Sequence, residues 1–557
     1  MTLKSYSNLR LKDFWGWLNS RDGNTNIQDN QCLESIWFTS QGNRIVSVPW
    51  AKNEIYARSF STPSDPFIGD WQGMTSYWEW VFWLYNNYIA AWKVGENGDA
   101  EVAYWYDSVS WKYQKIVDFA EQYTSVVAPS PKVRLWNMAA WFLWDIYVGV
   151  VDSFGFWAIK IYKFDPLTGN FTTMSPVGLP WVKFTSIAFY QGRLYLWGAD
   201  TNPASIYYSK SWTIATPSDS YDFSWYPSGS QVVWDGSSPV TGINVIKNDL
   251  LISTASSIWK VSWTFDDKVS KFWYQLDNVS SNWVINQQCL CHVEQDTLFY
   301  DGHSIRKLSY ESGGSSWYSG WLRDSSISEI IAPTLRTLAN DQTLAVSWFT
   351  YPYYKLALRS NTLVSYNDTI VWYNIIDKTF FVQTWLNVSC ATSVVSDRKY
   401  AYVGWYKTRF AMLDNIKSYW YEYDSTISNI YRSFRSKDYS LIDDVDFKRY
   451  AQLELSGNIS PNTKYHVDVV IDWMVIDTRT IYKPSSIWNT TGSSTSGATM
   501  SGAAGNNTET MVSYSERYEY FHDGRRFQFR IYSTEPWYIE LTNANIMWKE
   551  VPAYPIH

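Results

Sequence analysis

The segment Gly242–Ser262, GINVIKNDLLISTASSIWKVS, contains three short apolar stretches separated by two polar turns. The apolar stretches are rich in Val, Ile and Leu, which is typical of β-strands. The turns KND and TASS consist of residues that favour tight reversals of the chain. Because short turns can join only antiparallel neighbours, the segment predicts three consecutive antiparallel strands.

The same unit of strand, turn, strand and turn recurs along the chain. It is found at Ser186–Gly198 (SIAFYQGRLYLWG), Cys291–Ser309 (CHVEQDTLFYDGHSIRKLS) and Val394–Leu413 (VVSDRKYAYVGWYKTRFAML). The repeat is degenerate in sequence but regular in pattern. Radial repetition of small antiparallel sheets protects strand edges, so we predict a β-propeller over residues 51–427. A stack of β-sandwiches is the structural alternative.

The two ends of the chain differ from this repeat. From residue 428 to 557 the expected strands are longer and more regular, as in KYHVDVVID and RRFQFRIYS, which favours an antiparallel β-sandwich. A Ser/Thr/Gly-rich insert at residues 489–510 cannot bury a core and is expected to be a flexible loop or a contact that becomes ordered on assembly. Residues 1–50 show little periodicity and are expected to form an irregular, extended arm. The predicted fold class is therefore all-β.

Composition excludes several classes of protein. The chain has 557 residues, 46% of them hydrophobic, and a net charge of −7, which does not suit a basic nucleic-acid binder. The four cysteines form neither a disulfide framework nor a metal-ligand pattern. The first residues, MTLKSYSNLRLKDF, lack the apolar core of a secretory signal, and no apolar run reaches the ~18 residues of a membrane helix. We therefore expect assembly in a cytoplasm and no membrane.

Tryptophan is unusually frequent and glycine unusually rare. The chain has 35 Trp and 27 Gly, whereas glycine alone makes up ~7% of an average protein. Many tryptophans follow residues that form turns: Asp472-Trp473 joins two alternating apolar runs, as Asp-Gly does in a type I′ hairpin. Pro-Trp pairs occur at Pro49, Pro180 and Pro536, where Pro-Gly would form a type II turn.

This distribution suggests that most of the tryptophans stand for glycine in the natural protein. UGA is translated as glycine in some bacterial lineages and their viruses, and a gene of such a lineage translated with UGA as Trp would show this pattern. The alternative is a truly Trp-rich chain whose indole rings fill a core or bind sugars. That alternative leaves the preference of Trp for positions after Pro, Asp, Asn and Ser unexplained.

With those tryptophans taken as glycine, the N-terminus resembles the opening of a group of phage structural proteins. The matching residues are Phe14, Gly16, Leu18, Asn19, Asp29, Asn30, Gln31, Gly42, Ile45 and Pro49. The segments Ser186–Ser211, Trp234–Ser262, Tyr353–Phe381 and Gly524–Pro552 resemble later parts of the same group. The group is the tail-nozzle or tail-hub propeller proteins of phages, with similar head-completion and DNA-stabilisation proteins. The resemblance covers nearly the whole chain but includes no single diagnostic motif.

The resemblance implies a structural virion protein of the tail or neck and no enzyme. Its expected partners are further copies of this chain in a ring, the portal or adaptor, other tail proteins, and double-stranded DNA passing through the lumen to be retained and then ejected. No cofactor and no metal are expected. The alternative function is a carbohydrate-binding or carbohydrate-cleaving propeller at a virion tip, which would use exposed aromatic rings. An intracellular scaffold propeller is disfavoured, because WD and kelch signatures are absent.

Few residues suggest chemistry. The five histidines lie far apart without HExxH or HxH spacing, and no phosphate-binding or nucleophile-elbow motif is present. The run Asp443-Asp444-x-Asp446 is more typical of a solvated turn than of a calcium loop. The local basic clusters RSFRSKDYS and DGRRFQFR provide candidate contacts to DNA phosphates or to an acidic neighbouring subunit. These candidates are Arg432, Arg435, Lys437, Arg525 and Arg526.

Overall fold

The structure is a computed structural model of the 557-residue chain. It describes residues 7–11, 17–18, 31–36, 38–41, 44–47, 52–56, 71–77, 80–85, 88–94, 100–101, 106–107, 112–113, 117–118, 138–141, 145–151, 157–165, 171–174, 177–178, 186–190, 193–198, 202–211, 222–224, 229–233, 236–246, 249–266, 271–310, 322–338, 341–364, 366–393, 400–405, 410–415, 432–439, 447–460, 463–484, 512–534 and 539–551.

The chain divides into two compact units. One contains Met1–Trp50, Asp377–Thr384 and Ser418–His557, and the other contains Ala51–Ile376 and Trp385–Lys417. We call them the sandwich unit and the propeller unit. Both are built almost wholly from antiparallel strands, so the predicted all-β class, a propeller followed by a C-terminal sandwich, is confirmed. No helix in the described part of the chain is long and apolar enough to cross a membrane.

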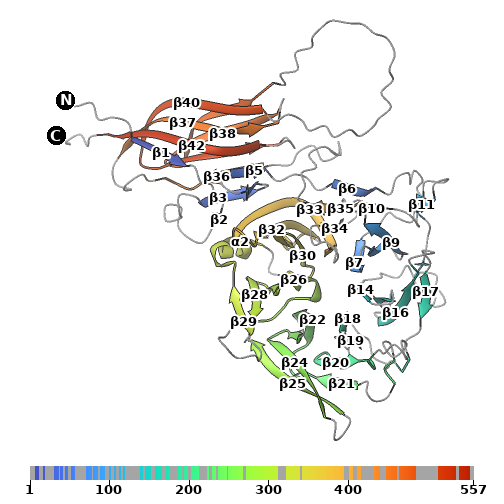
Figure 1. Cartoon of the computed structure of the whole chain (residues 1–557). Helices are drawn as coiled ribbons and strands as arrows, with labels where there is room; N and C mark the ends of the chain where they lie inside the picture. Colours follow the sequence, from blue (N-terminus) through green and yellow to red (C-terminus); the bar gives the residue numbers. More distant parts are fainter. Residues whose placement is uncertain are drawn as a thin grey trace, which may run out of the picture. The chain divides into compact units, whose positions relative to one another are not determined.

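The propeller unit is a succession of small sheets (Figure 1). The first sheet contains β7 (Trp71–Tyr77), β8 (Trp80–Tyr85), β9 (Tyr88–Val94) and β10 (Ala100–Glu101), with β13 (Val117–Asp118) on β9, and the second contains β14 (Met138–Trp141), β15 (Asp145–Val151), β16 (Trp157–Phe164) and β17 (Phe171–Met174). The third contains β18 (Ser186–Tyr190), β19 (Arg193–Trp197), β20 (Ser205–Tyr208) and β21 (Gly229–Val232), and the fourth contains β22 (Val240–Ile246), β23 (Asp249–Thr254), β24 (Ile258–Asp266) and β25 (Lys271–Ser280). The fifth contains β26 (Cys291–Val293), β27 (Asp296–Tyr300), β28 (Ile305–Tyr310) and β29 (Leu322–Ser326).

Two further sheets complete this unit. The sixth contains β30 (Val346–Thr350), β31 (Tyr353–Leu358) and β32 (Asn367–Asn374), and the seventh contains the second half of β33 (Thr379–Ser393), β34 (Tyr400–Trp405), β35 (Phe410–Asn415) and β6 (Lys52–Tyr56). The described residues thus form seven such sheets, besides the two-stranded ladder of β11 (Tyr106–Asp107) and β12 (Lys112–Tyr113). The short helical elements are η2 (Gln287–Cys289), η3 (Glu329–Ile331) and α2 (Ala332–Thr337).

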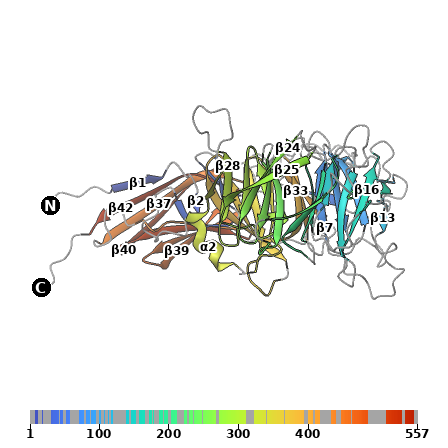
Figure 2. The same ribbon diagram turned by 90° about the horizontal axis from the view of Figure 1, so that it is seen from below.

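The seven sheets close into a ring. Consecutive sheets touch through strands near their start: β7 contacts β14, β14 contacts β18, β18 contacts β22, β26 contacts β30, and β34 contacts both β30 and β7. Figure 2 shows these sheets standing side by side. The Ser76 hydroxyl donates to the Ser393 carbonyl at 2.6 Å, joining the first sheet to the last. Because β6 precedes the first sheet in sequence and pairs with β35 of the last one, the two ends of the unit are held together.

A side chain completes the ring where two sheets meet. The Gln287 side chain accepts from the Ile243 backbone N–H at 2.6 Å and donates to the Ile243 carbonyl at 2.8 Å. It therefore satisfies both backbone groups of one residue of β22, as a neighbouring strand would. The Asn244 amide also donates to the Thr297 hydroxyl at 3.0 Å. These bonds connect the fourth sheet to the fifth.

The repeating unit predicted from sequence is present as antiparallel hairpins. Strands β22 and β23 pair from Ile246↔Asp249, and β26 and β27 pair from Val293↔Asp296. The fourth and fifth sheets also resemble each other in their side-chain contacts. The Lys260 ammonium lies 2.8 Å from the Asp249 carboxylate, and the Lys307 ammonium lies 2.5 Å from the Asp296 carboxylate. The same ion pair thus joins the second and third strands of two successive sheets.

The sandwich unit contains two facing sheets. The first has the order β4 (Phe38–Gln41), β5 (Arg44–Ser47), β42 (Ile539–Glu550), β37 (Lys448–Ile459) and β40 (Val512–Gly524), with β1 (Ser7–Leu11) on β42. The second has the order β3 (Gln31–Ile36), β36 (Arg432–Ser436), β41 (Phe527–Ser533), β38 (Lys464–Ile471) and β39 (Met474–Tyr482), with β2 (Trp17–Leu18) on β3.

Aromatic rings join the two sheets in the core. The ring of Phe38 in the first sheet lies 6.2 Å from Phe434 and 6.4 Å from Tyr465, both in the second sheet. The Phe434 ring in turn lies 6.0 Å from Phe529. These side chains are buried, and such edge-on ring pairs add to the stability gained from removing apolar surface from water.

The N-terminal residues differ from the extended arm expected from sequence. Within residues 1–50 the described parts form β1 to β5, and β1, β3 and β5 pair with C-terminal strands. Arg10 lies opposite Asn545, Val46 lies opposite Glu540, and Ser35 lies opposite Phe434. Short strands at sheet edges take their register from the longer strands beside them, so a weak periodicity of their own is sufficient. The Ser/Thr/Gly-rich insert at 489–510 lies outside the described residues.

Candidate functional site

Two turns of the sandwich unit, one a hairpin turn and the other a connection between the two sheets, lie against each other, and the second carries two of the candidate basic residues. Asp472 and Trp473 form the turn between β38 and β39, and Gly524 to Arg526 form the turn between β40 and β41. The Asp472 carboxylate accepts from the backbone N–H of Arg525 at 3.0 Å and of Arg526 at 2.9 Å. The Asp472 N–H donates to the Arg526 carbonyl at 3.1 Å. One acidic residue therefore fixes the backbone that carries both arginines.

The geometry of these turns explains their sequences. Asp472 has φ +47° and Trp473 has φ +68°, which confirms the predicted two-residue hairpin with positive φ at both positions. At Gly524 a side chain would meet its neighbour, because an added Cβ would lie 2.2 Å from Cγ2 of Ile471. Glycine at 524 thus allows the close approach of the two turns.

Arg525 and Arg526 each lie on an aromatic ring. The Arg525 guanidinium is 4.9 Å from the centroid of Phe447, and the Arg526 guanidinium is 5.0 Å from the centroid of Trp473. Both rings are exposed at the surface, Phe447 by 48% and Trp473 by 63%. A planar guanidinium stacked on a ring can still direct N–H groups outward, which is the arrangement that recognises phosphate or carboxylate groups. This end of the sandwich unit is the candidate anion-binding site.

The other three candidates lie in different surroundings. Arg432 is completely buried, and burial lowers the pKa of its guanidinium, although the Tyr465 hydroxyl opposes this effect. Arg435 is half-buried and donates to Gln528 at 2.6 Å. Lys437 is 8% exposed, with its ammonium 5.5 Å from the Tyr439 ring. Arg432 and Arg435 are three residues apart in β36 and so lie on opposite faces of the strand, and they do not form one exposed cluster with Arg525.

Three residues of the site were not predicted from the sequence. Phe447, Asp472 and Trp473 supply the rings and the carboxylate that hold the two arginines, yet only the turn at Asp472 was predicted, and no role in a site was assigned to it. The signal that could have found Asp472 is its place at a hairpin tip, where an Asp side chain can accept from backbone N–H groups. Its contact with the connection between β40 and β41, 53 residues away, depends on packing of the two sheets.

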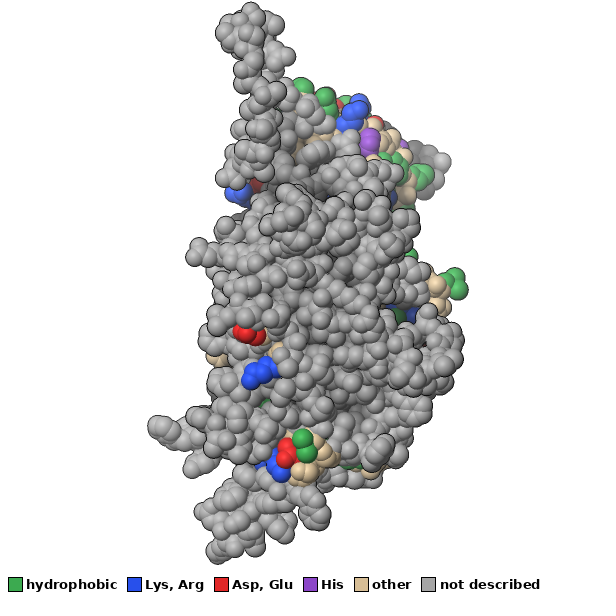
Figure 3. Space-filling view, turned by 90° about the vertical axis from the view of Figure 1, so that its right-hand side faces the viewer, with side chains coloured by type: hydrophobic (Ala, Val, Ile, Leu, Met, Phe, Trp, Pro, Cys, Tyr) green, Lys and Arg blue, Asp and Glu red, His purple; other side chains and the backbone are tan. Residues whose placement is uncertain are grey.

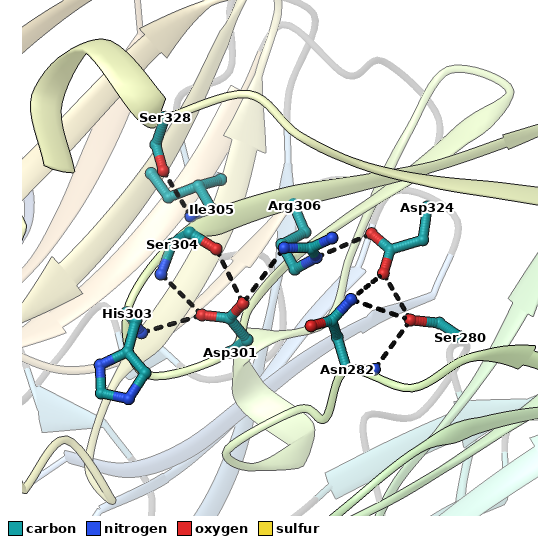
Figure 4. A network of polar contacts seen from close by, with 9 residues as sticks. All are labelled: Ser280, Asn282, Asp301, His303, Ser304, Ile305, Arg306, Asp324 and Ser328. Carbon is teal, nitrogen blue, oxygen red and sulfur yellow. Dashed lines mark hydrogen bonds and ion pairs between the residues drawn. The ribbon is translucent and has the colours of Figure 1, made fainter.

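A network of polar contacts lies in the fifth sheet of the propeller unit (Figure 4). The Arg306 Nε donates to Asp324 at 2.8 Å, and a second guanidinium nitrogen lies 3.6 Å from Asp301. Asp324 also accepts from the Ser280 hydroxyl and, at 2.6 Å, from the Asn282 amide. Both carboxylates are at least nine-tenths buried.

These two carboxylates are arranged for structure rather than for acid–base chemistry. Asp301 accepts from the backbone N–H groups of His303 and Ser304 at 2.8 and 2.6 Å, and from the Ser304 hydroxyl at 2.7 Å. A glycosidase needs one carboxyl that can release a proton to substrate and a second that stays ionised beside it. Here donors from the chain surround each carboxylate, and an arginine bridges the two.

No group of His, Cys, Asp and Glu side chains suited to a metal ion is found in the described part of the chain. The run Asp443-Asp444-x-Asp446 lies outside it. On the face drawn in Figure 3, acidic and basic side chains that are described lie intermixed instead of gathering by sign.

Comparisons with known proteins give no assignment. No family model matches the chain, and no curated protein matches it. Among solved structures, the WD40 domain of coronin from Toxoplasma gondii is similar with a TM-score of 0.34 and 8% identity, over 68% of this chain and 87% of that one. An exo-β-1,3-galactanase from Phanerochaete chrysosporium has a TM-score of 0.24 and 9% identity, over 89% and 100%. PorZ of Porphyromonas gingivalis, a surface component of a type-IX secretion system, has a TM-score of 0.32 and 9% identity over 70% of this chain, which spans 44% of PorZ. Similarities this low carry no information about activity.

Proposed function

We propose that this chain is a structural subunit of a phage tail or neck that forms part of the DNA channel, retains packaged DNA and passes it at ejection. The observation that carries the proposal is the chain-long resemblance to tail-nozzle and tail-hub proteins described above. The seven-sheet ring joined to a sandwich unit is compatible with it. The purified chain, alone or with portal protein, should assemble into rings with a central channel in electron micrographs. A chain that remains monomeric in both conditions would contradict the proposal.

The arginine pair at the end of the sandwich unit supplies the proposed contact to DNA phosphates. Replacing both Arg525 and Arg526 with serine should weaken binding of the assembled protein to short duplex DNA about tenfold. It should also reduce the steepness of the plot of log association constant against log salt concentration by roughly two. Binding assays at several salt concentrations measure both quantities. Arg517→Ser is the matched control, since Arg517 is 61% exposed and pairs with Glu519 elsewhere on β40. Equal effects of the control and the double variant would exclude a specific contact.

We further propose that tryptophans at turn positions stand for glycine in the natural protein. Among the described residues, the non-glycine positions with positive φ are Glu294, Lys378, Asp472 and Trp473. Trp473 is therefore in a conformation that glycine adopts freely and that other residues adopt at a cost of roughly 1–2 kcal/mol. By contrast Trp197 is completely buried in the propeller core, as expected of a true tryptophan.

Trp473→Gly should raise the free energy of unfolding by about 0.5–1 kcal/mol, because relief of the positive φ exceeds the entropy lost by glycine. It removes the ring under Arg526 and the Nε1–H bond to Asp438 at 3.3 Å but leaves the Asp472 bonds intact, so with glycine at 473 the backbone bonds to Asp472 still hold Arg526 in place. Urea denaturation measures the change. Trp283→Gly is the control: Trp283 packs on the His303 ring at 6.1 Å and is not among the positive-φ residues, so this variant should lose about 1 kcal/mol. Tryptophan found at position 473 by peptide sequencing of the native protein would contradict the recoding.

A carbohydrate-binding propeller is the second candidate function. The observation that favours it is Trp283, which is 37% exposed beside His303 and the Asp301 turn of the fifth sheet. An exposed indole near polar side chains is a common platform for a sugar ring. A glycan array that shows binding lost in Trp283→Ala would support this candidate, and an array without binding would remove it.

A further inference from the structure

Asp472 brings a negative charge to the candidate anion-binding site, where Arg525 and Arg526 bring two positive charges. One carboxylate oxygen, Oδ1, accepts from the backbone N–H of Arg525 at 3.0 Å and of Arg526 at 2.9 Å. The other, Oδ2, accepts from the same N–H of Arg525 at 3.1 Å. Successive backbone N–H groups in a turn form a natural site for an anion. The Asp472 carboxylate therefore occupies the backbone donors that a phosphate oxygen could use, and an external ligand is left with the two guanidinium groups.

The charge of Asp472 is not cancelled by a cation in the part of the chain that the structure describes. Its carboxylate is bonded to backbone N–H groups and is not part of an ion pair. The nearby Asp523 differs, because its carboxylate accepts two bonds from the Arg449 guanidinium, at 2.7 and 2.8 Å. Neutral N–H groups stabilise a carboxylate but leave its charge in place. The two arginines and Asp472 together thus give the site less positive charge than the arginines alone.

We propose that Asp472 sets the strength of phosphate binding at this site. Its side chain positions the turn that carries the two arginines, and its charge lowers their affinity for phosphate. A phosphate held by the guanidinium groups is repelled by a carboxylate a few ångström away, and near a protein surface this repulsion is only partly screened. The inference rests on the proposed DNA contact of Arg525 and Arg526 and adds the residue that limits it. A subunit that retains DNA and later passes it needs contacts that release.

Asp472→Asn removes the charge and keeps the geometry. The asparagine Oδ1 can accept both of the backbone bonds that the aspartate Oδ1 accepts. Asparagine also tolerates the φ of +47° at this position. The assembled variant should bind short duplex DNA about threefold more tightly than the unchanged chain at about 0.1 M salt. The gain should shrink as the salt concentration rises, because salt screens the repulsion that the substitution removes.

Asp472→Gly removes both the charge and the geometry. Glycine adopts the positive φ freely, so the hairpin between β38 and β39 is kept, but the turn from Gly524 to Arg526 loses its bonds to the side chain. This variant should bind the DNA at least about threefold more weakly than the unchanged chain, because arginines on a less ordered turn lose more entropy on binding. A role of charge alone would make both variants bind more tightly, and a role of structure alone would leave Asp472→Asn unaltered.

Glu516→Gln is the matched control for the loss of one negative charge. Glu516 pairs with Lys483 at 2.7 Å and belongs to the same strand, β40, as Gly524. The strand rise of about 3.4 Å per residue puts residue 516 about 27 Å from residue 524 along the strand. That separation exceeds the ~10 Å over which exposed charges act at about 0.1 M salt. The control should change the DNA affinity by less than about 1.5-fold.

Two probes separate this inference from the proposed function. Fluorescence anisotropy measures the affinity for duplex DNA, and titration calorimetry with inorganic pyrophosphate measures phosphate binding without DNA. For both probes we expect Asp472→Asn to bind most tightly, then the unchanged chain, then Asp472→Gly. The proposal is overturned if Asp472→Asn gains no affinity for pyrophosphate, or if Asp472→Gly binds it as tightly as Asp472→Asn. If this order holds for pyrophosphate and the assembled protein does not bind DNA, Asp472 limits a phosphate site and the DNA contact is what fails.

Discussion

Gly457→Ala should destabilise the sandwich unit by about 3–5 kcal/mol, near the upper end of single-residue effects. Gly457 lies in β37, between β42 and β40, in the interior of the first sheet. An added Cβ would lie 1.8 Å from the Glu540 carbonyl oxygen and 2.8 Å from its carbon. Both atoms belong to the backbone of the paired strand. Relief therefore requires the two strands to separate rather than a side chain to rotate.

The local register explains why the approach is so close. The ladder between β37 and β42 shifts between Ser456 and Gly457, so that Thr542 has no direct opposite. Ser456→Ala is the matched control, because the bond at this position is donated by Thr542 to the Ser456 carbonyl and survives the change. The control should lose less than about 1 kcal/mol. Urea denaturation of the sandwich unit compares the two variants. Similar urea midpoints for both would show that β37 and β42 can move apart at Gly457 without loss of stability.

The local part of the fold could be predicted from sequence. The hairpins at Gly242–Ser262 and Cys291–Ser309 depend on apolar alternation and on turn residues within about ten positions, and both are present. The turn at Asp472-Trp473 was predicted with positive φ at both residues and has it. In these cases the residues that determine the conformation are neighbours in the chain.

The long-range part could not be predicted from sequence. Strand β1 pairs with β42 across almost the whole chain, and β6 pairs with β35 of the last propeller sheet. Neither pairing has a local signal, because an edge strand is chosen by the surface that it completes. The burial of the basic residues could not be predicted from the sequence either. The RSFRSKD pattern resembles an exposed cluster. However, its strand β36 pairs with β3 at one edge and with β41 at the other, and Arg432 is buried.

The network around Arg306 is a second consequence of packing that the sequence does not reveal. Asp301 follows β27, Arg306 belongs to β28, and Asp324 belongs to β29, so three strands of one sheet bring the charges together. Ser280 and Asn282 approach from the end of the preceding sheet. The network therefore fixes the fifth sheet to the fourth, and its loss should loosen the ring of sheets at that point.

Asp324→Ala should destabilise the propeller unit by about 2–4 kcal/mol. The side chain is 7% exposed, and its removal leaves the Arg306 guanidinium, itself 18% exposed, with only the 3.6 Å contact to Asp301. Breaking a buried ion pair by removing one partner is strongly destabilising, because the remaining charge stays out of water without compensation. The Ser280 hydroxyl also loses its acceptor, and the Asn282 amide keeps only its bond to the Ser280 oxygen at 3.3 Å, which adds to the cost of burying these donors.

A double-mutant cycle distinguishes the interaction between Asp324 and Arg306 from the other effects of the two substitutions on stability. Asp324→Ala, Arg306→Ala and the double variant should give a coupling free energy of about 1–3 kcal/mol in urea denaturation. The matched pair in the same sheet is Asp296 with Lys307, which are 2.5 Å apart but 28% and 37% exposed. Its coupling should stay below about 1 kcal/mol, because solvent screens exposed charges and long side chains lose entropy on pairing. If the two cycles give equal coupling, burial is not what strengthens the ion pair between Arg306 and Asp324.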